Sequence, residues 1–236
     1  AAATVALALV WSPGAPAATQ PATPDQPLVV VRLFVDVADP LSREAWLLYR
    51  KTTGPTVAAG STPVLLRVHH TPAAPAGVGA LATHAALAAR AAGKELAFLD
   101  ALLGQPALDE GAVRAAAKAA GLDPDALLDR ARDDATRDRA TLEAQAARAM
   151  GVVGTPNALL NGRGVGGVPP HLALQRALQR ASEAAAADLA ALTRAAGKPP
   201  ADAALALERI GVLRASPAAI EPFDALRAGK APAKSK

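Results

Sequence analysis

Residues 151–163 have the sequence Gly-Val-Val-Gly-Thr-Pro-Asn-Ala-Leu-Leu-Asn-Gly-Arg, and this stretch decides the fold of the chain. The short apolar run from Asn157 to Asn161 has the length of a buried strand, and Asn161-Gly162 is a pair that two-residue type I′ hairpins prefer. A partner strand is expected at 165–168, followed by a helix through Ala181. The segment therefore predicts a closing β-β-α unit.

A second unit is predicted toward the N-terminus. Residues 28–37 (LVVVRLFVDV) are apolar at nearly every position, which is typical of a strand buried on both faces of a largely parallel sheet. Asp39-Pro40 combines a preferred N-cap with the residue favoured at the first helical position, so a helix should run to about Lys51. Residues 64–70 (VLLRVHH) predict the next strand, which completes a β-α-β unit.

A helical insertion is expected between these two units, over about residues 74–150. Residues 78–132 show a helical pattern with breaks at several glycines, and Asp123-Pro124 predicts the start of a long helix that ends near Met150. The core that these elements share has few bulky side chains, because only 3% of the residues are aromatic. The large side chains expected to be buried in it are those of Phe34, Trp46, Tyr49 and Phe98.

Three regions are expected along the chain. Residues 27–182 should form one α/β domain, and residues 183–236 a C-terminal extension with helices at 183–196 and 201–210 and a largely disordered, basic end. Residues 1–26 contain an apolar run, 1–11, followed by a Pro- and Ala-rich linker. This is the pattern of a secretory-signal remnant, although a disordered leader would have a similar composition. We expect a periplasmic or otherwise exported protein with no stable membrane span in the mature chain.

Charge and composition exclude several classes of function. The formal net charge is +4, but the basic residues alternate with acidic ones, and the chain lacks the basic stripe with interleaved aromatics that a nucleic-acid binder needs. The spacing of the four histidines matches no metal-binding motif, so neither a metal nor a cofactor is expected; they are His69, His70, His84 and His171.

The order of elements and three motifs resemble the DsbA-like family of thioredoxin-fold proteins. Residues 34–42 (FVDVADPLS) are similar to the family's turn from strand to helix, and residues 68–72 (VHHTP) to its His-aromatic-Pro strand end, with Thr71 at the aromatic position. Residues 151–163 are very similar to the family's Gly-Val-x-Gly-Thr-Pro, strand and Asn-Gly-Arg. The resemblance implies an α/β thioredoxin-like fold with an inserted helical subdomain and a cis proline at Pro156.

The family's two redox cysteines are absent, because the chain contains no cysteine at all. The resemblance places Asp39 and Ser42 at the two cysteine positions, in the sequence Asp39-Pro40-Leu41-Ser42. A carboxylate suits the positive end of a helix dipole but cannot attack a disulfide, and a serine hydroxyl does not replace a thiolate. The resemblance thus implies a redox-inactive protein that binds a polypeptide or partner protein at Asp39, Pro40, Leu41, Ser42, Thr155 and Pro156. The other interpretation of these residues is structural, with Asp39 as a helix cap and Pro156 as a turn residue.

Two enzymatic alternatives remain open at this point. Kappa-class glutathione transferases share the fold and use a serine near the start of the first helix, a pattern that Pro40-x-Ser42 matches in part, although their serine would fall at Asp39. Asp39, Ser42 and His70 contain the residue types of a hydrolytic set, but no nucleophile elbow accompanies them.

Overall fold

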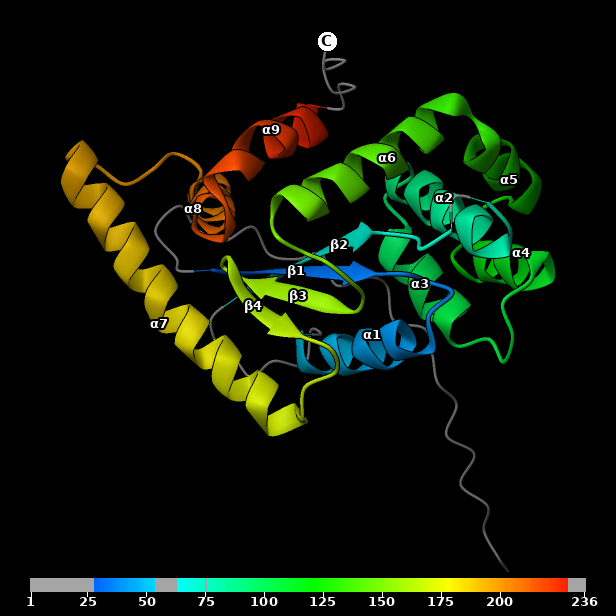
Figure 1. The fold of residues 1–236 in the computed structure, drawn as a ribbon, viewed down its shortest axis with the longest axis horizontal. Coiled ribbons are helices and arrows are strands. Elements are labelled where there is room, and N and C mark those ends of the chain that lie inside the picture. Colours follow the sequence, from blue (N-terminus) through cyan, green and yellow to red (C-terminus); the bar gives the residue numbers. More distant parts are fainter. Residues whose placement is uncertain (1–27, 54–62, 75, 229–236) are drawn as a thin grey trace, which may run out of the picture.

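A four-stranded mixed sheet with the order β2-β1-β3-β4 forms the centre of the molecule (Figure 1). The computed structural model describes residues 28–53, 63–74 and 76–228. The central strand β1 pairs in parallel with β2 and antiparallel with β3, and β3 pairs antiparallel with β4. The strands are β1 (Val29–Val35), β2 (Val64–His70), β3 (Asn157–Leu160) and β4 (Arg163–Gly166). All residues of β1 are buried, as its continuous apolar pattern predicted.

The tight turn between β3 and β4 confirms the predicted hairpin. Leu160 pairs with Arg163, so the loop consists of Asn161 and Gly162 alone. Their φ angles are 48° and 83°, and a type I′ turn requires positive φ at both central residues.

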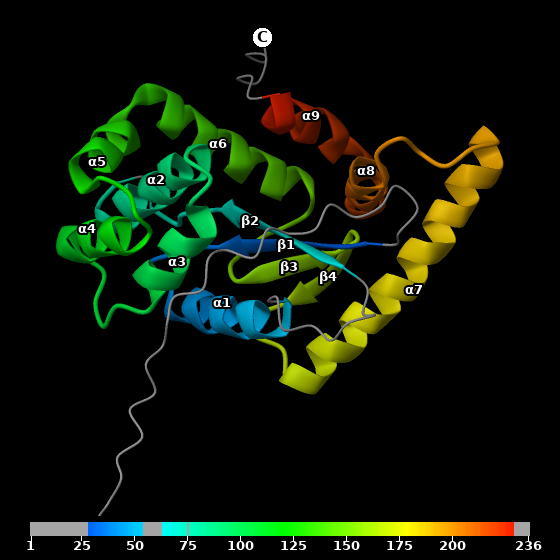
Figure 2. The same cartoon turned by 180° about the vertical axis from the view of Figure 1, so that it is seen from behind.

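The helices of the described residues surround this sheet on both faces and at one end (Figures 1 and 2). Helix α1 lies on one face, and α6, α8 and α9 lie on the other. Helices α2–α5 form a bundle beyond the end of β1, and α7 runs along the opposite side. The α-helices are α1 (Pro40–Thr53), α2 (Val78–Ala91), α3 (Glu95–Leu103), α4 (Glu110–Ala119), α5 (Pro124–Arg132), α6 (Asp134–Ala149), α7 (His171–Ala196), α8 (Ala203–Ala215) and α9 (Ile220–Ala228). The predicted α/β class and the helical insertion are confirmed.

Three sequence-based predictions were wrong: two about where helices begin and end, and one about disorder near the C-terminus. The long helix expected after Asp123 is broken at Asp133, an extended residue between α5 and α6. The helices expected on either side of residue 182 are one continuous helix, α7, because neither glycine nor proline interrupts its alanine-rich sequence. The segment 217–228, expected to be disordered, forms a short 3₁₀ turn and α9, which buries Phe223 and Leu226.

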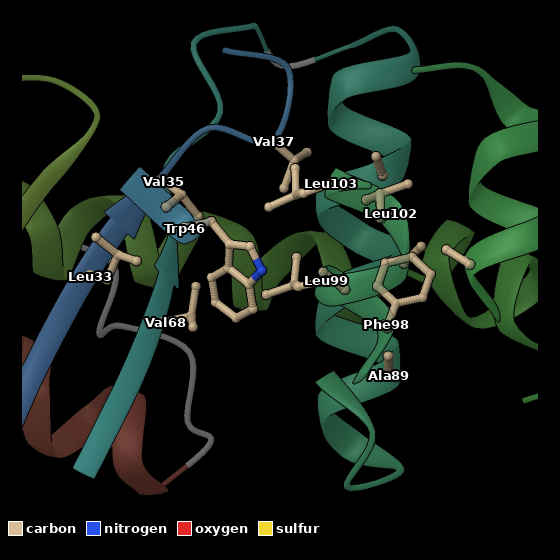
Figure 3. Close-up of a cluster of buried hydrophobic side chains, with 14 of the residues drawn as sticks. Leu33, Val35, Val37, Trp46, Val68, Ala89, Phe98, Leu99, Leu102 and Leu103 are labelled. Atoms are coloured by element: carbon tan, nitrogen blue, oxygen red, sulfur yellow. The ribbon is translucent and has the colours of Figure 1, made fainter. Parts of the chain in front are cut away.

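Trp46 joins the helical insertion to the sheet. Its ring extends from α1 and lies between two groups of side chains (Figure 3). Strands β1 and β2 are on one side of the ring, and Leu99 of α3 is on the other. The indole Nε1 donates a hydrogen bond to Asp100 Oδ1 at 3.0 Å, and Arg50 binds the same carboxylate through both of its oxygens. The four large aromatic residues predicted for the core, Phe34, Trp46, Tyr49 and Phe98, are all fully buried.

Candidate functional site

The loop before β3 and the start of α1 meet at one end of the sheet. Phe34 of β1 pairs with Asn157 of β3, so the antiparallel register continues with Pro156 beside Val35, shortly before α1 begins at Pro40. The Thr155-Pro156 peptide bond is cis. The structure therefore brings together the two segments that the sequence motifs singled out.

Asp39 caps the first helix with both carboxylate oxygens. Oδ1 accepts a hydrogen bond from the Leu41 amide at 3.1 Å, and Oδ2 accepts one from the Ser42 amide at 3.2 Å. The Ser42 hydroxyl also donates to Asp39 Oδ2, at 2.9 Å. The carboxylate thus satisfies N–H groups that helix starts leave without partners, at the end where the helix dipole favours negative charge.

Asp36 ties the chain after β1 to the chain after β2. Its Oδ1 accepts from the Ala38 amide at 2.9 Å and its Oδ2 from the Ala73 amide at 2.8 Å. The Asp36 amide in turn donates to the Ser42 hydroxyl at 3.2 Å. Ser42 is fully buried and its hydroxyl both donates and accepts, so this residue holds the turn together. Sequence reasoning quoted Asp36 as part of a motif but missed its contact with Ala73, which depends on where the chain turns after β2.

The predicted binding residues differ in exposure. Leu41 is 52% exposed, Thr155 is half-buried and Pro156 is buried. Within the described residues, the backbone N–H and C=O of Thr155 form no hydrogen bond. Val153, in the same loop, is 99% exposed. Sequence reasoning did not single it out, although its position in a glycine-bounded turn was a usable signal.

The two strand-end histidines are both engaged in buried contacts. His70 is fully buried and its Nε2 lies 2.8 Å from Glu95 Oε1, so the imagined set of Asp39, Ser42 and His70 is not assembled. The His69 ring stacks on Phe34 at 5.0 Å. Burial, assisted by the charge of Arg32, holds the pKa of His69 well below its usual value. In the described part of the chain, no group of three or more His, Asp or Glu side chains is arranged to hold a metal ion.

A buried ionic cluster fixes the helical insertion to the end of β2. We call it the insertion cluster: Arg90, Glu95, Arg139 and Glu143. Arg90 binds Glu95 and Glu143 together and donates to the Val68 carbonyl at 2.8 Å, while Glu143 Oε2 accepts the His70 amide at 2.7 Å. Burial alone would lower the pKa of Arg90, but Glu143 and Glu95 outweigh it and raise that pKa. The insertion cluster thus holds α2, α3 and α6 to the end of β2.

A cavity of about 440 Å³ lies inside the helical insertion. Residues of α2, α5 and α6 and Asp133 between them line it, including Leu87, Arg130 and Thr136, and none of the predicted site residues does. It is therefore separate from the site around Asp39 and Pro156.

The arrangement defines a class of protein. A β-α-β unit, a helical insertion and a β-β-α unit form one sheet, with a cis proline beside the start of the first helix. This is a thioredoxin fold with an inserted helical subdomain.

Comparison with known proteins agrees with this fold. The family model for the DSBA-like thioredoxin domain matches residues 68–179, so this part of the chain is similar to a thioredoxin domain of the DsbA-like kind. No curated protein matches the sequence significantly. The chain has no cysteine, and hence none of the thiols with which thiol-disulfide exchange proceeds.

Solved structures with this fold include a thioredoxin-like oxidoreductase from Silicibacter pomeroyi DSS-3, which is 28% identical. The match covers 66% of this chain and 87% of that one, with a TM-score of 0.56. The catalytic domain of Proteus mirabilis ScsC is 18% identical, with coverages of 69% and 87% and a TM-score of 0.57. A periplasmic thioredoxin-like protein from Salmonella enterica serovar Typhimurium is also 18% identical, with coverages of 66% and 84% and a TM-score of 0.52.

None of the helices described is long and apolar enough to cross a lipid bilayer. The apolar run 1–11, predicted as a signal remnant, lies outside the described residues.

Proposed function

We propose that this protein is a redox-inactive member of the DsbA-like family that binds an extended polypeptide segment of a partner protein. The binding face comprises Asp39 to Ser42 and Thr155-Pro156. The observation that carries the proposal is the backbone of Thr155, which is half-buried beside the cis proline and has both its donor and its acceptor free within the described residues. An extended peptide pairs with such groups as an added strand does.

Exposed apolar side chains favour a peptide as the occupant. Leu41 and Val153 belong to the two segments that form the face, and both project into solvent. Exposed aliphatic side chains next to free backbone groups suit a partner that alternates backbone pairing with apolar side-chain contacts. Asp39 and Ser42 contribute by holding the helix start in place, since their polar atoms already have partners.

A role in the cell envelope is the second part of the proposal. It is supported by the apolar run at residues 1–11 and by the periplasmic origin of the Salmonella protein with this fold. Fractionation of cells that express the full gene product would test it. Recovery of the protein in the cytoplasmic fraction alone would contradict it.

A glutathione transferase of the kappa class is the alternative function. It is supported by Ser42 near the start of α1, but the hydroxyl is buried and donates to Asp39. A transferase should be stabilised against heat by glutathione, because a ligand that binds only the folded state raises the midpoint of unfolding. We expect no such shift.

The binding face can be tested with exposed residues, whose replacement leaves the core intact. We expect Val153→Glu and Leu41→Glu each to weaken binding of an extended apolar peptide, selected from a peptide array, by roughly tenfold or more, since each places a charge in an apolar contact. Leu213→Glu is the matched control, because Leu213 is a similarly exposed leucine on α8. Unchanged binding in both test variants, with Pro156→Ala also unchanged, would show that the face is not the site.

A further inference from the structure

The C-terminal helices α8 and α9 cover the face of the sheet opposite α1 (Figures 1 and 2). They lie beyond residues 68–179, which match the DsbA-like family model. The α8 helix contacts β1, β3, β4 and α7, and α9 contacts α6. Their sequence shows no motif of function, so any role must come from what they touch.

The first contact joins α8 to the β3–β4 turn backbone to backbone. A Cβ atom added to Gly162 would lie 2.0 Å from the Gly211 carbonyl oxygen, so no other residue fits at Gly162 without moving the helix. Arg214 of α8 donates to the Asn161 carbonyl at 2.9 Å and binds both carboxylate oxygens of Asp188 in α7. Helix α8 is thereby fixed to the hairpin and to α7.

The second contact is a partly buried group of charges that we call the C-terminal cluster: Arg32, Arg67, Glu208 and Arg227. Arg32 and Arg67 are paired neighbours on β1 and β2, and like charges directly opposite each other destabilise a sheet. Glu208 of α8 binds Arg67 at 3.0 Å, Arg227 at 3.6 Å and Arg32 at 3.8 Å. The carboxylate of Glu208 on α8 therefore offsets the repulsion between Arg32 and Arg67 of the sheet.

The third contact links α9 to the site. Phe223 and Leu226 pack in one apolar cluster with Val152 and Met150, which lead into the loop before β3. The other buried members of this cluster are Phe34, Leu142, Ala146, Ala147, Leu159, Val212 and Ala219. Val152 is buried against this cluster, whereas its neighbour Val153 is exposed. The loop thus has one buried apolar residue in the cluster to which α9 contributes, and one exposed residue close in sequence to the proposed binding residues.

We propose that α9, which α8 joins to the sheet, is the positioning element of the loop 151–156, and that peptide binding at Thr155 depends on it. The binding part of this inference rests on the proposed function, but the positioning part does not. Val153 and Thr155 belong to a loop without regular secondary structure, so the packing of Val152 determines where they point. Helix α9 is therefore part of the site and not an appended segment.

Hydrogen exchange on the full chain tests the positioning part. The variants are Phe223→Ala and Leu226→Ala, and the control is Leu207→Ala, which removes an equally buried side chain of α8 from a separate apolar cluster. The reporters are the amides of Met150, Gly151 and Val152, which donate to carbonyls of α6. Relative to core amides of β1, we expect these reporters to exchange about tenfold faster in both α9 variants than in the control.

Peptide affinity measured on the same variants tests the binding part. We expect a loss of about tenfold for the α9 variants and little change for Leu207→Ala, because a displaced loop presents its backbone groups poorly. Equal exchange of the reporter amides in all variants would overturn the positioning role. If the unmodified protein binds no peptide while the reporters respond as expected, the proposed function fails and the positioning role stands. If the reporters respond but affinity does not change, the dependence of binding on α9 is wrong.

Discussion

The two ionic clusters hold different parts of the molecule to the same sheet, and they differ in their balance of positive and negative charge. The insertion cluster combines two carboxylates with two guanidinium groups, whereas the C-terminal cluster combines one carboxylate, Glu208, with three guanidinium groups. Glu143 also accepts the His70 amide, so the first cluster secures backbone as well as charge. The insertion cluster is therefore a network of balanced charge, whereas the C-terminal cluster depends on the one carboxylate of Glu208.

Exposure adds to this difference. Arg90, Arg139, Glu95 and Glu143 are shielded from solvent to a large degree, but Arg67 and Arg227 are about half exposed. Removing one member of a buried ion pair leaves the other charge desolvated without a partner, while exposed charges remain hydrated. The same chemical change should consequently have a larger effect in the insertion cluster.

The largest effect is expected for Glu143→Gln. The substitution keeps a hydrogen-bond acceptor near the His70 amide but leaves Arg90 and Arg139 with Glu95 as the remaining carboxylate of the insertion cluster. We expect the free energy of unfolding in urea to fall by roughly 3 kcal/mol. Glu110→Gln, which removes an exposed ion pair with Arg114, should change it by well under about 1 kcal/mol. Similar losses in the two variants would contradict the assignment of the insertion cluster as a rigid attachment.

A smaller effect is expected for Glu208→Gln. Arg32 and Arg67 then face each other without a carboxylate, but Arg67 can turn toward solvent, so we expect a loss of about 2 kcal/mol in the free energy of unfolding. Adding Arg67→Gln should restore part of this loss, because it removes the repulsion that Glu208 had compensated. A double variant that is less stable than the sum of the two single variants predicts would argue against repulsion as the cause.

The sequence predicted what depends on local pattern. The β-α-β and β-β-α units, the Asn161-Gly162 turn and the Asp39 cap follow from residue preferences within a few positions, and the structure contains all of them. The break at Asp133 and the helix α9 were missed, because a helical pattern continues across the first and the second forms by burying Phe223 and Leu226. Both require knowledge of what the segment packs against.

The same distinction applies to the candidate site. The family resemblance implied that Asp39 and Pro156 lie near each other, and strand register places their segments at the same end of the sheet. The contacts that support them come from distant segments: Asp36 binds the Ala73 amide, and Phe223 shares an apolar cluster with Val152. No spacing within the sequence indicates such pairs, so the dependence of the site on the C-terminal helices emerges only from the fold.

The smallest effect in this series is a pH dependence of the free energy of unfolding that arises from His69. Arg32 donates to His69 Nε2 at 3.2 Å, and protonation of that nitrogen would remove the acceptor and place a second cation beside Arg32. Burial and the Arg32 charge accordingly hold the pKa of His69 well below 6.5. Below pH 6.5 the unfolded chain binds a proton that the folded chain does not, so acidification favours unfolding.

We expect the free energy of unfolding to fall by about 1.4 kcal/mol from this group between pH 7.5 and 5.5, measured by urea denaturation. His69→Gln, which keeps an acceptor for Arg32 but cannot titrate, should show a correspondingly smaller loss. His171→Gln, at an exposed position, should retain the full dependence. His84 has a lowered pKa as well and contributes with the same sign in all three proteins, so it cancels from the comparison. An identical pH dependence in the His69 variant and the unmodified protein would mean that His69 accepts a proton in the folded state as readily as in the unfolded chain, which would contradict a lowered pKa for His69.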